Sequence, residues 1–237
     1  MVDFHSHIIN DTDDGSKGFS ESVALLYEAK KAGFDTVICT PHYMMGFYEK
    51  DVKYVSDRIK DLQIDSRRVG VNLYQANEIY AHEDICKFIS EKKATTINNS
   101  KYLLMEFPLT DEPMLNSIDI IKDIVKNGYV PIVAHPERYP YVQKKLRFAE
   151  DLVENGALLQ MNYASIDGFY GLKAKKTAIK LLKKKMISFL GTDTHRQKTM
   201  YTKMQKYIDH ILRYVSDEEF DNISNANALK VLHNEEI

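Results

Sequence analysis

The sequence of 237 residues has no tryptophan and only two cysteines, Cys39 and Cys86. Two cysteines so far apart exclude a disulfide-stapled scaffold and fit a reducing compartment. No apolar run approaches the roughly 18 residues that a membrane-spanning helix needs. The N-terminus also lacks the charged and apolar segments of a signal peptide. We therefore expect a cytoplasmic protein without a membrane span.

An excess of charge of one sign is also missing. The chain has 32 Lys and Arg against 34 Asp and Glu, for a net charge of −2. This balance gives no basic field that would favour nucleic acid. The basic run KAKKTAIKLLKKK at 173–185 has a helical pattern, and we interpret it as a solvated helix face. No strand is followed by a dinucleotide fingerprint or a P-loop.

The chain alternates between short apolar segments and longer amphipathic segments. Its length and hydrophobic fraction of 44% fit one globular domain over residues 1–237. We predict strands at 2–4, 36–40, 72–76, 102–106, 130–134, 158–161 and 188–191. Helices are predicted at 20–33, 50–66, 83–93, 113–128, 143–156 and 171–186, with further helical residues toward the C-terminus. Ser20 would open the first helix, and Gly33, Gly128 and Gly156 would close three of them.

This alternation indicates βαβ units and a parallel sheet of seven strands. Seven strands fit either an open, doubly wound sheet or a closed, slightly irregular barrel. A barrel is natural at this chain length, since (β/α) barrels typically have ~250 residues.

Histidines and acidic residues gather at the ends of the predicted strands. His5 and His7 lie two residues apart in the first strand region, so their side chains point to the same face. The same types of side chain end or follow five more strands, in the order His42, Glu78, Glu106, His135, and Asp193 with His195. In a barrel, these strand ends form the face where catalytic groups collect. The pattern predicts a metal site.

Together with Asp14, the set has nine candidate ligands and no thiolate. Imidazole and carboxylate donors suit Zn²⁺, Mn²⁺ or Fe²⁺, and the absence of thiolates argues against a structural zinc site. One ion uses about four to six protein groups, so nine ligands imply more than one ion. The four carboxylates carry −4, so two divalent ions leave a neutral site and three leave +2. Only the three-ion site attracts a phosphate dianion.

Seven motifs then support a family resemblance. In order along the chain they are HSHIINDTDDG, ICTPHY, ANEIY, LLMEFP, VPIVAHPERY, LLQMNYASI and GTDTH. Their order and spacing closely resemble the bacterial PHP-domain (polymerase-and-histidinol-phosphatase) protein-tyrosine phosphatases of capsular and extracellular polysaccharide gene clusters. The resemblance covers residues 1 to about 200. It implies an α/β fold, a distorted seven-stranded TIM-like barrel with the metal site at the C-terminal ends of the strands.

The resemblance also implies the distribution of the metal ligands. Carried over position by position, it gives three ions, with one held by His5, His7 and Asp193 and a second by Asp14, His42 and His195. A third ion would be held by Glu106 and His135, with Glu78 as a bridge between ions. Manganese is the metal that the family favours, and the donor set suits iron and zinc as well.

Two arginines are candidates for contacting phosphate. Arg138, in HPERY, matches the family's phosphate-contacting arginine. The family has a second arginine several residues beyond the last metal histidine, and no arginine lies at that offset here. Arg196 directly follows His195, and either replaces that arginine or faces solvent.

The resemblance implies hydrolysis of phosphotyrosine in a protein, by attack of a water that the ions have acidified. The implied partner is a bacterial tyrosine kinase that controls polysaccharide export. A strong general acid is less essential, because the leaving tyrosine hydroxyl has a pKa of ~10.

Several other functions compete with this one. A cysteine-based phosphatase is excluded, because Met45 and Lys92 occupy the positions where its arginine would follow Cys39 or Cys86. A metal-dependent amidohydrolase or nuclease on a barrel shares the first-strand histidine pair, but not the HPERY arginine. Histidinol-phosphate phosphatase is a nearer rival. The loop YMMGFYE at 43–49 either binds an aromatic or protein ligand, or simply packs on the barrel rim. A non-catalytic metal-binding scaffold would lack ligands, and none is missing.

Overall fold

The computed structural model describes residues 1–237 and contains nine short strands, all paired in parallel. They are β1 (Val2–Ser6), β2 (Thr36–Cys39), β3 (His42–Tyr43), β4 (Asn72–Gln75), β5 (Glu78–Tyr80), β6 (Tyr102–Glu106), β7 (Val130–Ala134), β8 (Leu158–Asn162) and β9 (Phe189–Gly191). Their order is β1-β2-β4 in one sheet and β3-β5-β6-β7-β8-β9 in the other.

The two sheets form a closed, distorted barrel because β9 returns to β1. The Asp193 amide donates to the His5 carbonyl at 2.8 Å, and the His7 amide donates to the Thr194 carbonyl at 2.9 Å. A parallel bridge between Ser6 and Thr194 lies in the same seam. The structure therefore confirms a barrel and excludes the open sheet.

All seven predicted strands are present, as β1, β2, β4, β6, β7, β8 and β9, and the structure adds two short strands, β3 and β5. The predicted strand at 36–40 continues after a break as β3, and that at 72–76 continues as β5. Pro41, which has no amide hydrogen to donate, lies in the first break, and Asn77 lies in the second. The Asn77 side chain joins the two breaks by donating to the Pro41 carbonyl at 3.1 Å. These breaks turn the ends of both strands toward the barrel mouth.

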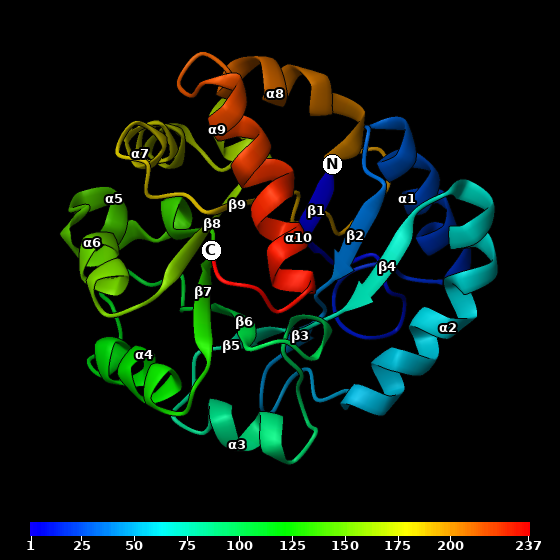
Figure 1. Ribbon diagram of the computed structural model, residues 1–237, viewed down its shortest axis with the longest axis horizontal. Coiled ribbons are helices and arrows are strands. Elements are labelled where there is room, and N and C mark those ends of the chain that lie inside the picture. Colours follow the sequence, from blue (N-terminus) through cyan, green and yellow to red (C-terminus); the bar gives the residue numbers. More distant parts are fainter.

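Most helices surround the strands, and the C-terminal helices cross one end of the barrel, as Figure 1 shows. The helices are α1 (Phe19–Lys31), α2 (Val52–Val69), α3 (Ile85–Ser90), α4 (Ser117–Lys126), α5 (Pro140–Lys144), α6 (Arg147–Glu154), α7 (Leu172–Lys183), α8 (Met204–Ile211), α9 (Asp217–Asp221) and α10 (Asn227–Leu232). Short 3-10 or π turns accompany them at Ile97–Asn99, Pro136–Arg138, Tyr163–Asp167, Tyr201–Lys203 and Asn222–Ala226.

Two helix predictions were wrong in detail. The helix predicted at 143–156 is split into α5 and α6, because Lys145 takes an extended conformation with φ −144° and ψ 118°. The first helix begins at Phe19 with Gly18 as its N-cap, so Ser20 does not cap it. The three glycines at helix ends were predicted correctly. Gly33, Gly128 and Gly156 have φ of 93°, 84° and 97°, which glycine adopts without strain.

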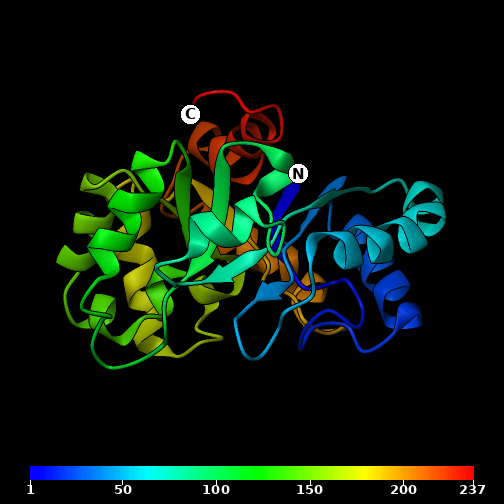
Figure 2. The same cartoon turned by 90° about the horizontal axis from the view of Figure 1, so that it is seen from below.

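The apolar core has two parts. The larger part lies between the strands and the surrounding helices. The smaller part fills the barrel interior, where the Phe4 and Phe189 rings stack with centroids 4.0 Å apart. Val231 and Leu232 of α10 belong to this interior part. Figure 2 shows the C-terminal helices at one end of the strands and the loop after β1 at the other. The open end of the barrel is therefore the end where the strands finish.

Two expectations about the surface are also met. The lysines of the basic run on α7 are mostly exposed, while Ala174, Ala178, Leu181 and Leu182 face the core. No helix combines the length and apolar character needed to cross a membrane.

Candidate metal centre

All nine predicted ligands lie together at the carboxyl end of the barrel. Three overlapping groups have ligand atoms within 4.8 Å of one another: His5, His7 and Asp193; His7, Asp14, His42 and His195; and His42, Glu78 and Glu106. His135 adjoins the third group, with its Nε2 3.0 Å from Glu78 Oε1 and 3.7 Å from Glu106 Oε2.

The first group is buried at the closing seam of the barrel. His5 lies in β1 and His7 directly follows this strand, and their Nε2 atoms lie 3.0 Å apart. Asp193 Oδ1 lies 3.6 Å from the first of these nitrogens and 3.5 Å from the second. Three donors from the ends of β1 and β9 therefore converge on one point.

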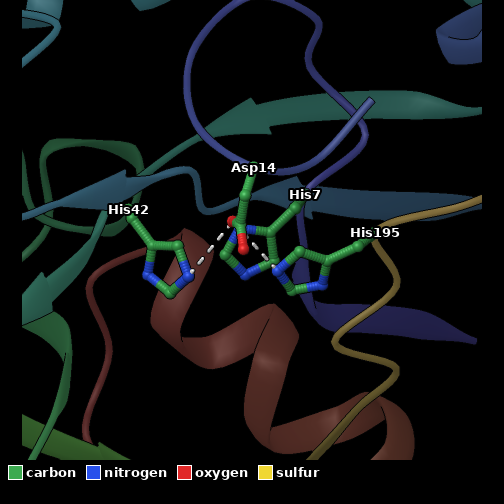
Figure 3. A group of neighbouring side chains, drawn as sticks. All are labelled: His7, Asp14, His42 and His195. Carbon is green, nitrogen blue, oxygen red and sulfur yellow. Dashed lines mark ion pairs between the residues drawn. The ribbon is translucent and has the colours of Figure 1, made fainter. Parts of the chain in front are cut away.

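In the second group, the Asp14 carboxylate points toward His42 and His195 (Figure 3). Asp14 Oδ1 lies 3.6 Å from His42 Nε2 and 3.4 Å from His195 Nε2. The rings of His7 and His195 are stacked, with centroids 4.0 Å apart. The Asp14 side chain is 53% exposed, whereas His7 is fully buried. Access to the cluster is therefore from the side of this second group.

Glu78 lies at the centre of the cluster. Its Oε2 is 3.1 Å from both His5 Nε2 and His42 Nδ1, and its Oε1 is 3.0 Å from His135 Nε2. His42 Nδ1 also lies 3.3 Å from Glu106 Oε1. His42 thus faces the third group with Nδ1 and the second group with Nε2. The resemblance had assigned this histidine to the second group alone.

Three polar residues that the sequence analysis did not name hold the ligands in place. Asp13 Oδ2 lies 2.7 Å from His7 Nδ1 and accepts the His42 amide at 2.8 Å. Gln160 Oε1 lies 2.8 Å from His5 Nδ1, and the Gln160 amide donates to Asn162 Oδ1 at 2.9 Å. Asn162 in turn donates to Asp193 Oδ2 at 2.7 Å. Hydrogen bonds of this kind orient imidazole and carboxylate ligands toward a metal.

A sequence signal existed for two of these residues. Gln160 and Asn162 alternate along β8 and are fully buried in an otherwise apolar strand. A buried polar side chain requires a partner, and alternation aims both at the barrel interior. For Asp13 the sequence offered no such signal, because three aspartates crowd the segment DTDDG.

The charges of the cluster are strongly coupled to one another. Burial disfavours the charged form of His7 and would lower its pKa. The charge and the hydrogen bond of the neighbouring Asp13 carboxylate act in the opposite direction and raise the pKa of His7 to about 10. The hydrogen bond with His195 lowers the pKa of Asp14 to about 2. Burial opposes ionisation of Glu78 as well, yet His5 and His42 hold its pKa well below the usual range. The acidic side chains are therefore anionic and available as ligands.

The backbone around the cluster is unusually constrained. His135 and Asp193 have φ of 35° and 54°, in the left-handed region that side chains other than glycine rarely adopt. A Cβ atom on Gly191 would lie 2.5 Å from the Cβ of His5, and one on Gly15 would lie 2.3 Å from the His7 carbonyl oxygen. The close approach of these two glycines allows both loops to pack against β1.

The two candidate arginines differ in their contacts. Arg138 Nη1 donates to Asp193 Oδ2 at 2.7 Å, and its guanidinium covers the Tyr170 ring. Arg196 Nη1 instead donates to the backbone carbonyls of Gly15 and His195, the latter at 2.7 Å. Arg138 therefore borders the metal cluster directly, whereas Arg196 ties together the two loops that carry Asp14 and His195.

The cysteines take no part in the site. Cys39 is fully buried in β2, and burial raises the pKa of its thiol. Burial raises the pKa of the Cys86 thiol as well. Neither group is a thiolate nucleophile, since nucleophilic cysteines have lowered pKa values.

The residues present fit a group of divalent ions. The donors are imidazole nitrogens and carboxylate oxygens, which suit Mn²⁺, Fe²⁺ or Zn²⁺. For His5 and His7, the second ring nitrogen is held by Gln160 and Asp13, so each ring directs Nε2 at the cluster. This arrangement is typical of metal-ligating histidines.

Comparison with known proteins places this geometry in a family. The model of the family described as "Capsular polysaccharide synthesis, CpsB/CapC" matches residues 1–233. The putative tyrosine-protein phosphatase CapC of Staphylococcus aureus is 33% identical over 197 residues, which cover 82% of this chain and 77% of that protein. The tyrosine-protein phosphatase CpsB of Streptococcus pneumoniae is 28% identical, with 98% of each chain covered.

A solved structure agrees with the same assignment. It comes from work on YwqE from Bacillus subtilis and CpsB from Streptococcus pneumoniae, described there as unique metal-dependent tyrosine phosphatases. Its TM-score is 0.92 at 26% identity, with 100% of this chain and 96% of that chain covered.

Proposed function

This chain belongs to the CpsB/CapC family of capsular polysaccharide synthesis, and we propose that it hydrolyses protein phosphotyrosine with three divalent ions held at the barrel mouth. It is a metal-dependent protein-tyrosine phosphatase. The observation that carries the proposal is the convergence of nine imidazole and carboxylate side chains on one face of the barrel.

The proposed ligand sets follow the three groups of side chains. One ion would be held by His5, His7 and Asp193, a second by Asp14, His42 and His195, and a third by Glu106 and His135. Glu78 would be a ligand shared between them. The distances from its two oxygens support this role, because Oε2 reaches His5 and His42 while Oε1 reaches His135.

The charge balance supports three ions rather than two. With Asp13, five carboxylates contact the cluster, namely Asp13, Asp14, Glu78, Glu106 and Asp193. Three divalent ions exceed this charge by one unit, and Arg138 adds another positive charge. Two divalent ions would leave −1, which Arg138 only brings to zero, so a two-ion site would have no net attraction for a phosphate dianion.

When bound, the ions supply a water acidic enough to give hydroxide near neutral pH, and they draw charge from the phosphate oxygens. Arg138 is the residue placed to donate charge-assisted hydrogen bonds to the equatorial phosphate oxygens. Tyrosine leaves as a phenolate whose hydroxyl has a pKa of ~10, so its departure needs less help from an acid than that of an alkoxide.

The metal and the partner are further parts of the proposal. We infer Mn²⁺ as the physiological metal from the family resemblance, while the mixed imidazole and carboxylate donor set suits iron and zinc as well. The proposed partner is a tyrosine kinase that controls capsular or extracellular polysaccharide synthesis, and the family's role supports it. The free thiols of Cys39 and Cys86 fit a reducing cytoplasm.

The test measures phosphate release from a phosphotyrosine peptide, a phosphoserine peptide and histidinol phosphate. The protein is stripped with a chelator and then supplied with Mn²⁺, Fe²⁺ or Zn²⁺. We expect release from the phosphotyrosine peptide only, lost on stripping and restored best by Mn²⁺. His135→Ala should abolish it, whereas His233→Ala, a change of the same kind at an exposed position, should not.

Other results would contradict parts of the proposal. A preference for histidinol phosphate would retain the metal site but replace the substrate. Structural similarity gives no support to histidinol phosphate as the substrate. The histidinol phosphate phosphatase of Lactococcus lactis shares the fold alone with this chain, at 16% identity and a TM-score of 0.61. No release from any substrate by the metal-loaded protein would refute the phosphatase function.

A further inference from the structure

The segment that follows His42 forms a small hairpin beside the metal cluster. The Met44 and Tyr48 backbones exchange two hydrogen bonds of 2.8 Å, and Gly46 turns the chain with a φ of 83°. The hairpin Met44–Tyr48 directly continues β3, the strand that begins with the ligand His42. Its position is therefore fixed relative to the cluster.

This hairpin presents apolar side chains to solvent. Phe47 is 75% exposed and Met45 is 52% exposed, whereas Tyr43, just before the hairpin, is buried in the core. Of the two interpretations left open by the sequence, packing on the barrel rim therefore applies to Tyr43 and not to Met45 or Phe47. At these exposed fractions, Phe47 and Met45 bury little apolar surface and contribute little to the core.

A cavity of about 560 Å³ lies between the hairpin, the loop after β1 and the start of α2. Its lining includes three aromatic residues, Phe47, Tyr48 and Tyr54, together with the polar residues Asp11, Thr12, Asp13, Glu49 and Lys50. We refer to this space as the aromatic cavity.

The aromatic cavity adjoins the metal cluster, because two of its lining residues, Asp13 and Tyr48, contact metal ligands. Asp13 holds His7 Nδ1 at 2.7 Å and the His42 amide at 2.8 Å. The Tyr48 ring is stacked on the His42 ring, with centroids 5.7 Å apart and an angle of 17° between the planes. A ligand that reaches the ions from this direction passes against aromatic surface.

We propose that the aromatic cavity is the subsite for the phenyl ring of phosphotyrosine and for the residues that flank it in the substrate protein. This inference rests on the proposed function. The exposed side of the cluster is the side of Asp14 and His42, so the phosphate enters there and its ester bond points outward. The ring at the far end of that bond then meets Phe47 and Tyr48, with which it can form offset or edge-to-face contacts.

The subsite accounts for selectivity between phosphate esters. Phosphoserine and small polar phosphates carry no ring that could contact Phe47 and Tyr48. Phosphotyrosine gains this contact in addition to the hydrogen bonds and ions that bind any phosphate group. Aromatic contacts of this kind change affinity by roughly two- to tenfold.

The experiment uses the Mn²⁺-loaded full chain and compares wild type with Phe47→Ala, Phe47→Tyr and Ile64→Ala. Ile64, 72% exposed on α2, matches Phe47 in exposure but lies ten residues after Tyr54, about 15 Å along the helix. For each protein we would measure KM and kcat with a phosphotyrosine peptide, and the inhibition constant of inorganic phosphate, which probes the ions and Arg138 without a ring.

We expect Phe47→Ala to raise KM for the peptide roughly two- to tenfold, with the inhibition constant of phosphate and the bound metal unchanged. Phe47→Tyr keeps an aromatic ring and should have the wild-type KM. Ile64→Ala should have it as well. An unchanged KM in Phe47→Ala would overturn the subsite. So would a parallel rise in the phosphate inhibition constant, since the hairpin would then support the ions instead of contacting the ring.

The wild-type measurement separates this inference from the function on which it rests. If wild type fails to release phosphate from the peptide, the phosphotyrosine phosphatase function itself is refuted, and with it the subsite. If wild type is active and Phe47→Ala has the same KM as wild type, only the subsite is refuted.

Discussion

The guanidinium carbon of Arg138 lies 4.5 Å from the centroid of the Tyr170 ring, and Arg138 Nη1 donates to Asp193 Oδ2 at 2.7 Å. The Tyr170 hydroxyl lies 3.3 Å from Asn162 Nδ2 and 3.4 Å from the same Asp193 oxygen. The ring supports the face of the guanidinium, and the carboxylate anchors one nitrogen. Arg138 is therefore held in one orientation, with Tyr170 as its positioning residue.

Removing Tyr170 should weaken phosphate binding through this arginine. We expect Tyr170→Leu to raise the inhibition constant of inorganic phosphate about threefold, since a cation–π contact is worth ~0.5–1 kcal/mol at an exposed site. Tyr170→Phe keeps the ring and should behave as wild type. Arg138→Ala should lower kcat/KM by about a hundredfold, as the loss of one preorganised donor does in other hydrolases. Equal constants for Tyr170→Leu and wild type would show that the ring does not position Arg138.

Asp13 is predicted to support metal binding without being a ligand. Asp13→Asn weakens the hydrogen bond that orients His7, and changes of this kind typically lower metal affinity 10–100-fold. Titration of the stripped protein with Mn²⁺ measures the effect. Asp123→Asn, on the exposed face of α4, is the matched control and should bind as wild type. Equal affinity for both variants would contradict the role of Asp13.

Metal uptake should release protons. The Asp13 carboxylate, against the effect of burial, raises the pKa of His7 to about 10, so His7 is protonated in the metal-free protein at neutral pH. A metal binds only the neutral ring, and each binding event must displace that proton. Apparent affinity should therefore rise from pH 6 toward pH 10 and fall as the pH is lowered. An indicator in weakly buffered solution measures the release, which should decrease in Asp13→Asn. Binding without proton release would refute the protonated state of His7.

Gly191 is predicted to be essential for the seam between β9 and β1. An alanine there would place its Cβ 2.5 Å from the Cβ of His5 and 3.0 Å from the His5 backbone nitrogen. The strands must separate, which should cost about 1–3 kcal/mol of unfolding free energy and weaken metal binding. Gly18→Ala is the control, because its Cβ would meet no atom within 4 Å. Urea unfolding of the stripped proteins tests this, and equal midpoints for both variants would contradict it.

The parallel strands and their ligand-bearing end could be predicted from the sequence for a specific reason, whereas closure into a barrel rested on chain length and the family resemblance. Strands that alternate with helices must run parallel, and parallel strands place their carboxyl ends on the same face. His42, Glu78, Glu106 and His135 follow four such strands, so the pattern already indicates that they meet. The assignment of individual ligands to ions came from the family resemblance, and the distances now support it as a proposal.

The breaks in two strands could not be predicted, because they depend on contacts across the fold. Asn77 joins Pro41 to Thr95, through hydrogen bonds of 3.1 and 3.0 Å. Without these partners the segments 36–40 and 72–76 are indistinguishable from continuous strands. The same applies to Arg196, whose sequence position allowed either a phosphate contact or solvent, and whose guanidinium instead bonds to the Gly15 carbonyl.

The sequence by itself determined the fold class, the end of the barrel that carries the site, and the chemical nature of the donors, because local periodicity and residue type are sufficient for each. Only the tertiary structure decided which role each aspartate of the segment DTDDG takes. Asp13 turns inward to His7 while Asp14 reaches His42 and His195, although the two are adjacent in the chain. The difference arises because the loop backbone and the distant strand ends together set the direction of each side chain, and neither is encoded in the order of residues within DTDDG.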